Sequence, residues 1–305
     1  MSSAWLEELK AQSPDLLVRE QVMMKQLTTF RIGGPAEYLI EPRSVFELQL
    51  VWKIAQKYHL PFFLMGHGSN LLVLDGGIPG ITVRLGGAFS EAVLLNETEW
   101  SVQAGMLLSD LAKKSQILGL SGLEFAAGIP GTVGGGLYMN AGAYGGEMAQ
   151  VVTGADVFDG SRVFHLSAEE LELSYRHSLC MDHPDWLITQ VELKLTPGDP
   201  DAIRAVMDDL QQRRRDKQPL SQPSAGSFFK RPQGDYAARL IEAAGLKGFR
   251  VGGAAVSEKH AGFVVNLGNA TAKDVLSLME QVQERVEAMS AIRLSPEVRF
   301  VGVEG

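Results

Sequence analysis

The feature that most constrains this chain is a glycine-dense segment with apolar and aromatic residues between its glycines. Residues 128–146 read GIPGTVGGGLYMNAGAYGG, and eight of these nineteen residues are glycine. A solvated flexible linker has no need of the interleaved apolar side chains. Glycine permits unusual backbone dihedrals and lets backbone N–H groups approach a ligand closely. We therefore expect a tight loop that contacts a phosphate-bearing ligand, with a purely structural turn as the alternative.

Two further loops share this glycine-rich character, namely residues 28–35 (TTFRIGGP) and residues 66–71 (GHGSNL). The second loop follows an apolar strand expected at residues 61–65, but it lacks the third glycine of the dinucleotide-binding fingerprint. The chain also contains no Walker A, H-E-x-x-H or G-x-S-x-G sequence. We therefore expect neither a Rossmann dinucleotide site, nor a P-loop, nor a serine-hydrolase elbow.

Charge and composition exclude several partners. The chain of 305 residues has a net charge of −8, so no overall positive field attracts nucleic acid or an anionic membrane. The single cysteine, Cys180, cannot form an internal disulfide, and no metal-ligand spacing surrounds it. We expect a plain buried or semi-exposed thiol there, with a reactive nucleophile as the alternative, and no metal site. No apolar run suits a signal peptide or a membrane span, so we expect a cytoplasmic protein without membrane insertion. No obligate protein partner is evident.

Helix signals and alternating apolar residues predict an α+β fold. Residues 1–26 are expected to form an amphipathic helix and a connector. A capping box of Ser44 and Glu47 opens the next expected helix, and Asp199, Pro200 and Thr271 mark later helix starts. The expected helices are 45–58, 109–118, 200–215, 235–244 and one from 272 that carries Val286. The expected strands are 61–65, 81–85, 101–104, 151–158, 162–166, 187–195, 263–266 and one after Pro296. The break at residues 196–200 predicts domains at 27–197 and 198–305.

The three glycine loops are followed by four longer motifs. These are SYRHS at 174–178, AGSFFK at 225–230, GGAAVS at 252–257 and PEVRF at 296–300. In this order the loops and motifs resemble the UDP-N-acetylenolpyruvoylglucosamine reductase family, over residues 26–303. The resemblance implies a two-lobed FAD-binding domain of the PCMH/vanillyl-alcohol-oxidase type, followed by a smaller α+β substrate-binding domain.

The resemblance also implies an activity in peptidoglycan precursor synthesis. NADPH would reduce bound FAD and leave, and UDP-N-acetylglucosamine enolpyruvate would then take its place and be reduced to UDP-N-acetylmuramate. By the same resemblance, Ser227 would donate a proton, while Arg176 and Glu297 would flank the developing enolate. A guanidinium beside a carboxylate stabilises charge where it accumulates, which agrees with these assignments.

The remaining site residues also follow from the resemblance. The positions expected to bind FAD are Thr29, Arg31, Gly33, Gly66, Gly68, Ser69, Asn70, Gly128, Pro130, Gly131, Thr132, Gly134, Gly135, Asn140, Gly142, Ala143 and Tyr144. The positions expected near the UDP-sugar are Tyr175, Lys217, Arg231, His260 and Arg299. His260 departs from the glutamine of some relatives, which leaves its role open. FAD is expected to bind noncovalently, because the position of His67 varies in the family.

The length between motifs separates two branches of the family, one of which carries a tyrosine-bearing capping loop. Only 51 positions separate Arg176 from Ser227, so this chain resembles the shorter branch that lacks the loop. Two other interpretations stay open at this point. One is an alcohol or sugar oxidase on the same flavin fold, and the other is a non-catalytic flavin or nucleotide-sugar sensor. The presence of Arg176, Ser227 and Glu297 disfavours the sensor, which has no need of a proton donor.

Overall fold

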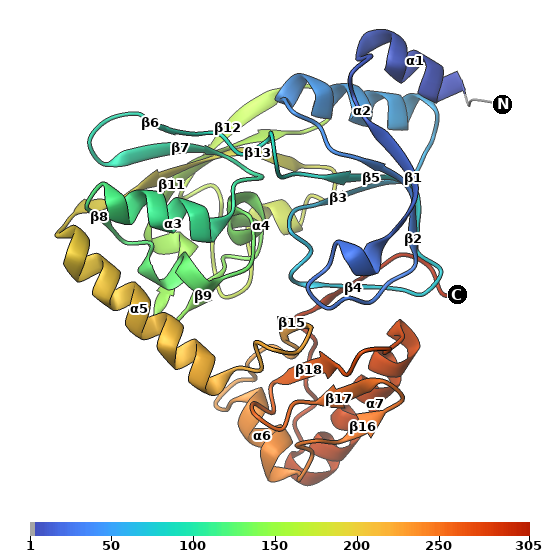
Figure 1. The fold of residues 1–305 in the computed structure, drawn as a ribbon, viewed down its shortest axis with the longest axis vertical. Coiled ribbons are helices and arrows are strands. Elements are labelled where there is room, and N and C mark those ends of the chain that lie inside the picture. Colours follow the sequence, from blue (N-terminus) through green and yellow to red (C-terminus); the bar gives the residue numbers. More distant parts are fainter. Residues whose placement is uncertain (1–3) are drawn as a thin grey trace. The chain divides into compact units, whose positions relative to one another are not determined.

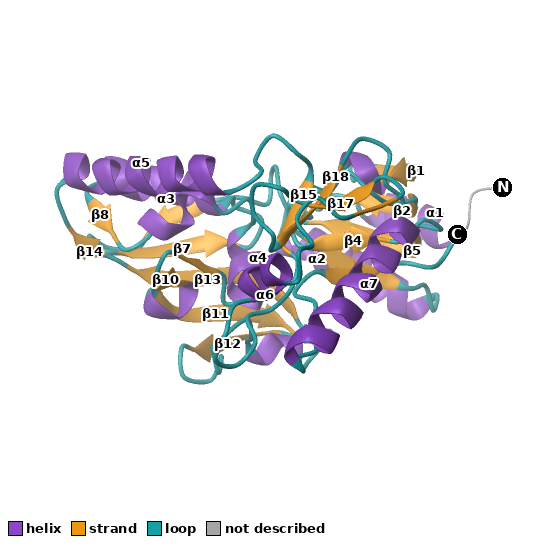
Figure 2. Cartoon of the chain, turned by 90° about the horizontal axis from the view of Figure 1, so that it is seen from below, coloured by secondary structure: helices purple, strands orange, loops and turns teal. Residues whose placement is uncertain are grey.

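The computed structural model describes residues 4–305, and the chain divides into two compact units (Figure 1). Unit 1 comprises the described part of Met1–Arg19, together with Leu39–His67 and Gly80–Gln212. Unit 2 comprises Glu20–Tyr38, Gly68–Pro79 and Arg213–Gly305. Each unit contains both helices and strands, so the predicted α+β class is confirmed (Figure 2).

The largest sheet of unit 1 has five strands in the order β12-β11-β13-β7-β6, and every neighbouring pair is antiparallel. Its centre is apolar because Val191 of β13 lies opposite Ala155 of β11 and Val102 of β7, and all three are fully buried. The strands are β6 (Ala92–Leu94), β7 (Glu99–Gln103), β11 (Val152–Phe158), β12 (Val163–Ser167) and β13 (Leu187–Lys194). The three strands predicted at 151–195 are confirmed.

Helix α2 (Val45–Lys57) begins as the sequence predicts, because the Ser44 side chain accepts from the Glu47 backbone N–H at 3.2 Å. The second half of the predicted capping box is replaced by other contacts. The Glu47 carboxylate accepts from the Arg43 backbone N–H at 2.7 Å and from the Arg43 guanidinium. It also accepts from the Ser13 hydroxyl at 3.1 Å, just beyond helix α1 (Ala4–Gln12). These contacts hold the pKa of Glu47 below its ordinary value despite its burial.

A four-stranded sheet has the order β1-β2-β5-β3. Its strands are β1 (Val18–Met23), β2 (Pro35–Ile40), β3 (Phe62–Met65) and β5 (Ile78–Arg84), and β3 pairs with β5 in parallel. The connector expected before residue 27 therefore contains strand β1 and a 3₁₀ turn, η1 (Met24–Gln26). The VREQVM sequence of β1 has three adjacent polar residues, so it shows no clean alternation.

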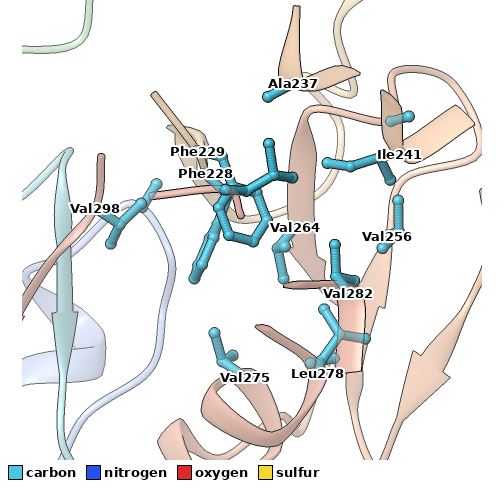
Figure 3. Close-up of a cluster of buried hydrophobic side chains, with 14 of the residues drawn as sticks. Phe228, Phe229, Ala237, Ile241, Val256, Val264, Val275, Leu278, Val282 and Val298 are labelled. Carbon is cyan, nitrogen blue, oxygen red and sulfur yellow. The ribbon is translucent and has the colours of Figure 1, made fainter. Parts of the chain in front are cut away.

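Unit 2 is built around the sheet β15-β18-β17-β16 and two helices. Its strands are β15 (Ser224–Ser227), β16 (Arg250–Val251), β17 (Ala254–Val256) and β18 (Phe263–Asn266), and its helices are α6 (Ala237–Ala243) and α7 (Ala272–Ser290). Phe228 and Phe229 pack with Val264, Val275 and Leu278 in one buried cluster (Figure 3). Thr271 caps α7 in a capping box with Asp274, as its sequence predicts for the helix start.

Helix α5 (Pro200–Lys217) begins where Asp199 accepts from the Ala202 backbone N–H at 3.1 Å, as predicted. The other short elements are β4 (Leu71–Val73), α3 (Leu108–Ile117), β8 (Leu120–Ser121), η2 (Glu124–Gly128), β9 (Gly142–Ala143), β10 (Gly146–Glu147), η3 (Met148–Gln150), η4 (Leu179–Met181), β14 (Thr196–Pro197) and β19 (Arg299–Val301). Within residues 4–305, no helix is both long and apolar enough to span a bilayer. Cys180 is fully buried, and burial raises the pKa of its thiol to about 11, which agrees with the expectation of an unreactive residue.

Candidate active site

The glycine-dense segment is not a continuous loop. Residues Val133–Tyr138 form helix α4, whose N-cap Thr132 accepts from the Gly135 backbone N–H at 3.2 Å. The expectation of a loop is therefore wrong at these residues. Packing explains the glycines of this helix, since a Cβ added at Gly134 would lie 2.6 Å from the Ala104 Cβ. A Cβ at Gly136 would similarly lie 2.9 Å from a Leu108 methyl carbon.

The backbone donors at the start of α4 are only partly available to a ligand. The Val133 amide donates to Met106 at 2.7 Å, and the Gly134 amide donates to Ala104 at 2.9 Å. The amides of Gly131 and Thr132 donate no such bond to any backbone carbonyl among the described residues. The backbone donors that fit a phosphate are therefore the amides just before the helix. The expected phosphate-binding part of the segment is limited to this turn.

The loop after β3 meets the same turn within unit 1. A Cβ at Gly66 would lie 2.4 Å from the Thr132 Oγ1, so this position accepts only glycine without a shift of the N-cap. His67 follows Gly66 and is half-buried, and burial together with nearby Arg84 lowers the pKa of its imidazole. At neutral pH the ring is therefore uncharged.

Arg176 occupies a tight hairpin whose ends are tied to the glycine-dense segment. Ser174 and His177 exchange two backbone hydrogen bonds of 3.1 Å each, which leaves Tyr175 and Arg176 as the turn residues. The Arg176 guanidinium donates to the carbonyls of Asn140 at 3.4 Å and Gly142 at 3.2 Å. The Tyr175 ring lies 5.3 Å from the same guanidinium. Thus one predicted catalytic residue contacts two of the predicted FAD-binding positions.

In unit 2, the loop at residues 28–33 is joined to the loop at residues 68–70 and to strand β15. The Thr29 amide donates to Gly68 at 3.3 Å, and the Thr29 hydroxyl donates to the Ser224 carbonyl at 2.7 Å. The same hydroxyl also lies 3.5 Å from the Ser69 carbonyl, a longer contact. A Cβ at Gly33, whose φ is +131°, would lie 2.5 Å from the Val73 Cβ. The loops predicted at residues 28–35 and 66–71 are therefore neighbours, although about 40 residues separate them in the sequence.

One residue of this region carries no signal in the sequence. The Asn266 side chain donates to the carbonyls of Phe30 and Arg31, each at 3.2 Å, and its own oxygen accepts from Gly268 and Ala270. It therefore fixes the loop that carries Arg31, whose φ is +55°. Over 200 positions separate the partners, and neither hydropathy nor spacing can reveal such a contact.

Ser227 ends strand β15 in a rigid frame while its own side chain is exposed. It lies opposite Phe263 of β18, and the pairing is irregular between Ser224 and Ser227, where Gly226 adopts φ +80°. The next residue, Phe228, is 1% exposed and donates its amide to Gly262 at 2.8 Å. The buried phenylalanine thus anchors the backbone and leaves the neighbouring hydroxyl accessible.

The structure brings the Glu297 backbone directly against this strand. The Glu297 amide donates to the Phe228 carbonyl at 2.8 Å, and the Asn70 side chain donates to the Glu297 carbonyl at 3.1 Å. Arg299 follows in β19, which pairs in parallel with β4, and its amide donates to the Asn70 carbonyl at 3.0 Å. Asn70 therefore aligns the segment that carries both charged residues.

The other predicted substrate contacts lie in unit 2 as well. The Arg231 guanidinium lies 4.1 Å from the centre of the Tyr236 ring. The Gly262 amide donates to the His260 Nδ1 at 3.1 Å, so in the neutral ring the proton is on Nε2. Burial lowers the pKa of His260, and the positive charges of Lys247 and Lys217 act in the same direction. A neutral donor at Nε2 is consistent with this environment.

The predicted site residues therefore form two groups. Unit 2 holds Ser227 and Glu297 with the loops of Thr29 and Gly68, whereas unit 1 holds Arg176 with the turn before α4. Among residues 4–305, four of the eight non-glycine residues with positive φ belong to the predicted site, namely Arg31, Asn140, Tyr144 and Arg176. Such conformations cost about 1–3 kcal/mol each and gather at functional sites, so this pattern favours a ligand site at these positions.

The chemistry of these positions fits FAD. The amides of Gly131 and Thr132, which donate to no backbone acceptor among the described residues, match a bound diphosphate. Comparison with known proteins agrees, since the family described as "FAD binding domain" matches residues 36–163. The fold and the site thus define an FAD-binding protein, and the predicted cofactor is confirmed.

The particular family follows from the remaining matches. The family described as "UDP-N-acetylenolpyruvoylglucosamine reductase, C-terminal domain" matches residues 218–301. UDP-N-acetylenolpyruvoylglucosamine reductases of Rubrobacter xylanophilus and Alkaliphilus oremlandii are each 47% identical to this chain. The first match covers 92% of this chain and 93% of the relative, and the second covers 95% of each.

A crystal structure of UDP-N-acetylenolpyruvylglucosamine reductase from Thermus caldophilus superposes with a TM-score of 0.81 at 40% identity. The match covers 94% of this chain and all of that one. This chain belongs to the UDP-N-acetylenolpyruvoylglucosamine reductase family, which confirms the resemblance seen in the sequence. It is accordingly an oxidoreductase with an FAD-binding domain.

Proposed function

We propose that this protein reduces UDP-N-acetylglucosamine enolpyruvate to UDP-N-acetylmuramate, with NADPH as the source of hydride, in the cytoplasmic synthesis of peptidoglycan precursors. Membership in the reductase family and the matched FAD-binding domain support the reaction. When bound, FAD accepts hydride from NADPH and supplies hydride to the substrate. The amides of Gly131 and Thr132, together with the neighbouring Gly66, would hold its diphosphate.

The residues of the chain would then handle charge and the proton. Hydride addition to the terminal vinyl carbon leaves an enolate next to the substrate carboxylate, and the Arg176 guanidinium would stabilise that charge. Glu297 would flank the same group from its position beside strand β15. Ser227 would donate its proton to the neighbouring carbon, a task that suits a weak acid because the enolate is a strong base.

One observation supports this assignment most directly: the backbone next to Ser227 is fixed, whereas the Ser227 side chain is exposed. Two backbone contacts fix the residue after Ser227, since the Phe228 amide donates to Gly262 and its carbonyl accepts from Glu297. A hydroxyl held in this way can be aimed at one carbon without losing access to the substrate. A serine in an ordinary turn has no need of such anchoring.

The test separates the two half-reactions in stopped-flow experiments. Reduction of the flavin by NADPH needs no proton from this hydroxyl, so Ser227→Ala should leave its rate nearly unchanged. Reoxidation of the flavin by the enolpyruvyl substrate should fall by about 10²–10⁴-fold, the usual contribution of a positioned proton donor. Ser227→Cys should recover part of the rate, because a thiol is a stronger acid of similar size.

Ser224→Ala is the matched control, because it removes a hydroxyl from the same strand three residues away. It should affect neither half-reaction by more than a few-fold. If Ser227→Ala slows flavin reduction by NADPH as much as flavin reoxidation, Ser227 is not the proton donor and serves the architecture of the strand instead.

A further inference from the structure

Asn140 is a fully buried residue whose side chain joins two segments of unit 1. Its Nδ2 donates to the Ser174 carbonyl at 2.9 Å, and its Oδ1 accepts from the Ala149 amide at 2.9 Å. Both polar ends are therefore in contact with protein. With no exposed surface, the side chain has no atom left with which to contact a cofactor.

The bond to Ser174 joins the hairpin that carries Arg176 to residues 140–142, which provide the acceptors of its guanidinium. The Ser174 carbonyl accepts from Asn140, and the Ser174 amide and carbonyl close the hairpin on His177. The Asn140 carbonyl, with that of Gly142, accepts from the Arg176 guanidinium. The same asparagine thus holds both the backbone from which Arg176 projects and one of the acceptors that orient its tip.

Backbone conformation supports the same conclusion. Asn140 has φ +39° and Arg176 has φ +55°. Asparagine tolerates the left-handed region better than most residues, whereas arginine gains nothing from it. Because Arg176 occupies a turn position that suits glycine, contacts outside the turn must stabilise it there.

We propose that Asn140 is a positioning residue for Arg176, and that its side chain acts through the hairpin at residues 174–177 instead of binding FAD. The proposal rests on the proposed role of Arg176 in the substrate half-reaction. It predicts that loss of the Asn140 donor slows the reaction of reduced enzyme with the enolpyruvyl substrate. Flavin content and flavin reduction by NADPH should be nearly unaffected.

Asn140→Asp isolates the bond to Ser174, because the new side chain keeps an acceptor for the Ala149 amide but loses the amide donor. In the holoenzyme at neutral pH, the maximal rate of flavin reoxidation by substrate should fall about 10²-fold, the usual effect of misplacing a catalytic group by about 1 Å. The substrate concentration at half-maximal rate should change much less. The loss should shrink as the pH is lowered, because the protonated carboxyl regains an O–H donor for Ser174.

Asn140→Gly removes both side-chain bonds without backbone strain, since glycine accepts φ +39°. It should give the same selective loss, without recovery at low pH. Ser178→Ala is the matched control. Its hydroxyl is also buried and also joins the two segments, donating to the Tyr138 carbonyl at 2.8 Å, but it touches neither Arg176 nor its acceptors. This variant should change the reoxidation rate less than about threefold, well below the effect of a misplaced catalytic group.

A double-mutant cycle distinguishes this inference from the proposed function. In an Arg176→Ala background, Asn140→Asp should slow flavin reoxidation little further, because the residue that Asn140 positions is absent. If Arg176→Ala alone leaves reoxidation unchanged, the proposed role of Arg176 fails. If Arg176→Ala is slow but Asn140→Asp is not, the positioning role fails. Loss of FAD from Asn140→Asp or Asn140→Gly, or equal slowing by Ser178→Ala, would also overturn it.

Discussion

At the scale of single residues, the most informative positions are those where the backbone allows few side chains. Gly68 has φ +70° and is buried, and its carbonyl accepts from the Thr29 amide. Any side chain here is strained, and it would lie within the loop that we propose to contact FAD. The position therefore tests ligand contact and backbone strain together, and a control must separate them.

We expect Gly68→Ala to lower FAD retention at least about tenfold, beyond the roughly 1 kcal/mol of strain that such a change costs the fold. Gly245→Ala is the control, because Gly245 has the same φ of +70° and nothing within 4 Å of an added Cβ. Flavin absorbance per protein after gel filtration measures retention, and urea unfolding measures strain. Equal flavin content in both variants would refute a contact between Gly68 and FAD.

His260 gives a prediction about pH. Burial holds its pKa below the ordinary value of about 6.5, so the unfolded chain binds this proton more readily than the folded one. The corresponding stability is complete above pH 6.5 and is lost as the pH falls toward the folded pKa. The carboxylates with lowered pKa, such as Asp159 and Asp235 at about 2, lose their contributions only below about pH 4.

We therefore expect the free energy of unfolding to decrease between pH 7.5 and pH 5.5, and His260→Gln to reduce this slope. Urea titrations at four pH values across the interval measure it. His67, whose pKa is also lowered by burial, should contribute a separate and additive part of the slope. An unchanged slope in His260→Gln would mean that this ring takes up its proton equally well in the folded and unfolded protein.

At the scale of secondary-structure elements, the sequence predicts what local signals determine. Helices α2, α5 and α7 begin within a residue of their predicted starts, because Ser44, Asp199 and Thr271 cap them through contacts three residues away. Strand β15 escapes prediction, because its partner β18 is distant in sequence and SAGS has no β-branched residue. Strands β16 and β17 pair with each other across Gly252 and Gly253, and they escape prediction because they have only two and three residues. The same holds for the site: motifs reveal Ser227 and Glu297, but only the fold shows them on adjoining backbone.

Helix α4 is the element where composition misleads. Three consecutive glycines disfavour a helix by about 1 kcal/mol each relative to alanine, yet the segment is helical. Tertiary packing decides the outcome, because Gly134 lies against Ala104 and leaves no room for a side chain. Sequence propensity and packing therefore make opposite predictions for an alanine substitution.

We expect Gly134→Ala to lower the free energy of unfolding by about 1–3 kcal/mol, since the overpacked Cβ outweighs the gain in helix propensity. Gly135→Ala is the control, because Gly135 is exposed and its nearest contact to an added Cβ is 3.3 Å. That variant should be unchanged or slightly more stable. Urea unfolding of the flavin-free proteins measures both, and a stabilised Gly134→Ala would contradict the packing explanation.

At the scale of the whole molecule, neither compact unit is a continuous segment. The chain passes between the units within β1, β2, β5 and α5, and again between His67 and Gly68. The matched C-terminal family domain at residues 218–301 lies wholly in unit 2, but it lacks residues 20–38 and 68–79 of that unit. The matched segment is therefore continuous in the sequence but does not contain all of unit 2.

The missing segments contribute to the core of unit 2 in three ways. Phe30, Ile32 and Leu72 are at most 2% exposed within its buried cluster. Strand β4 provides the parallel partner of β19. Asp75 caps α7, accepting from the Ala272 and Lys273 amides at 2.9 and 3.1 Å. A fragment of residues 213–305 would expose the apolar surface that these residues cover.

We therefore predict that residues 213–305, produced alone, show no cooperative unfolding transition, although a family domain spans most of them. Each large apolar side chain lost from a core lowers the free energy of unfolding by about 2–5 kcal/mol. Three such losses are comparable to the whole free energy of unfolding of a typical domain. Circular dichroism during urea titration measures the transition. In the intact chain, Phe30→Ala should be destabilised by about 3–5 kcal/mol. A fragment that unfolds cooperatively, together with a near-neutral Phe30→Ala, would show that residues 20–38 and 68–79 only cover a core complete without them.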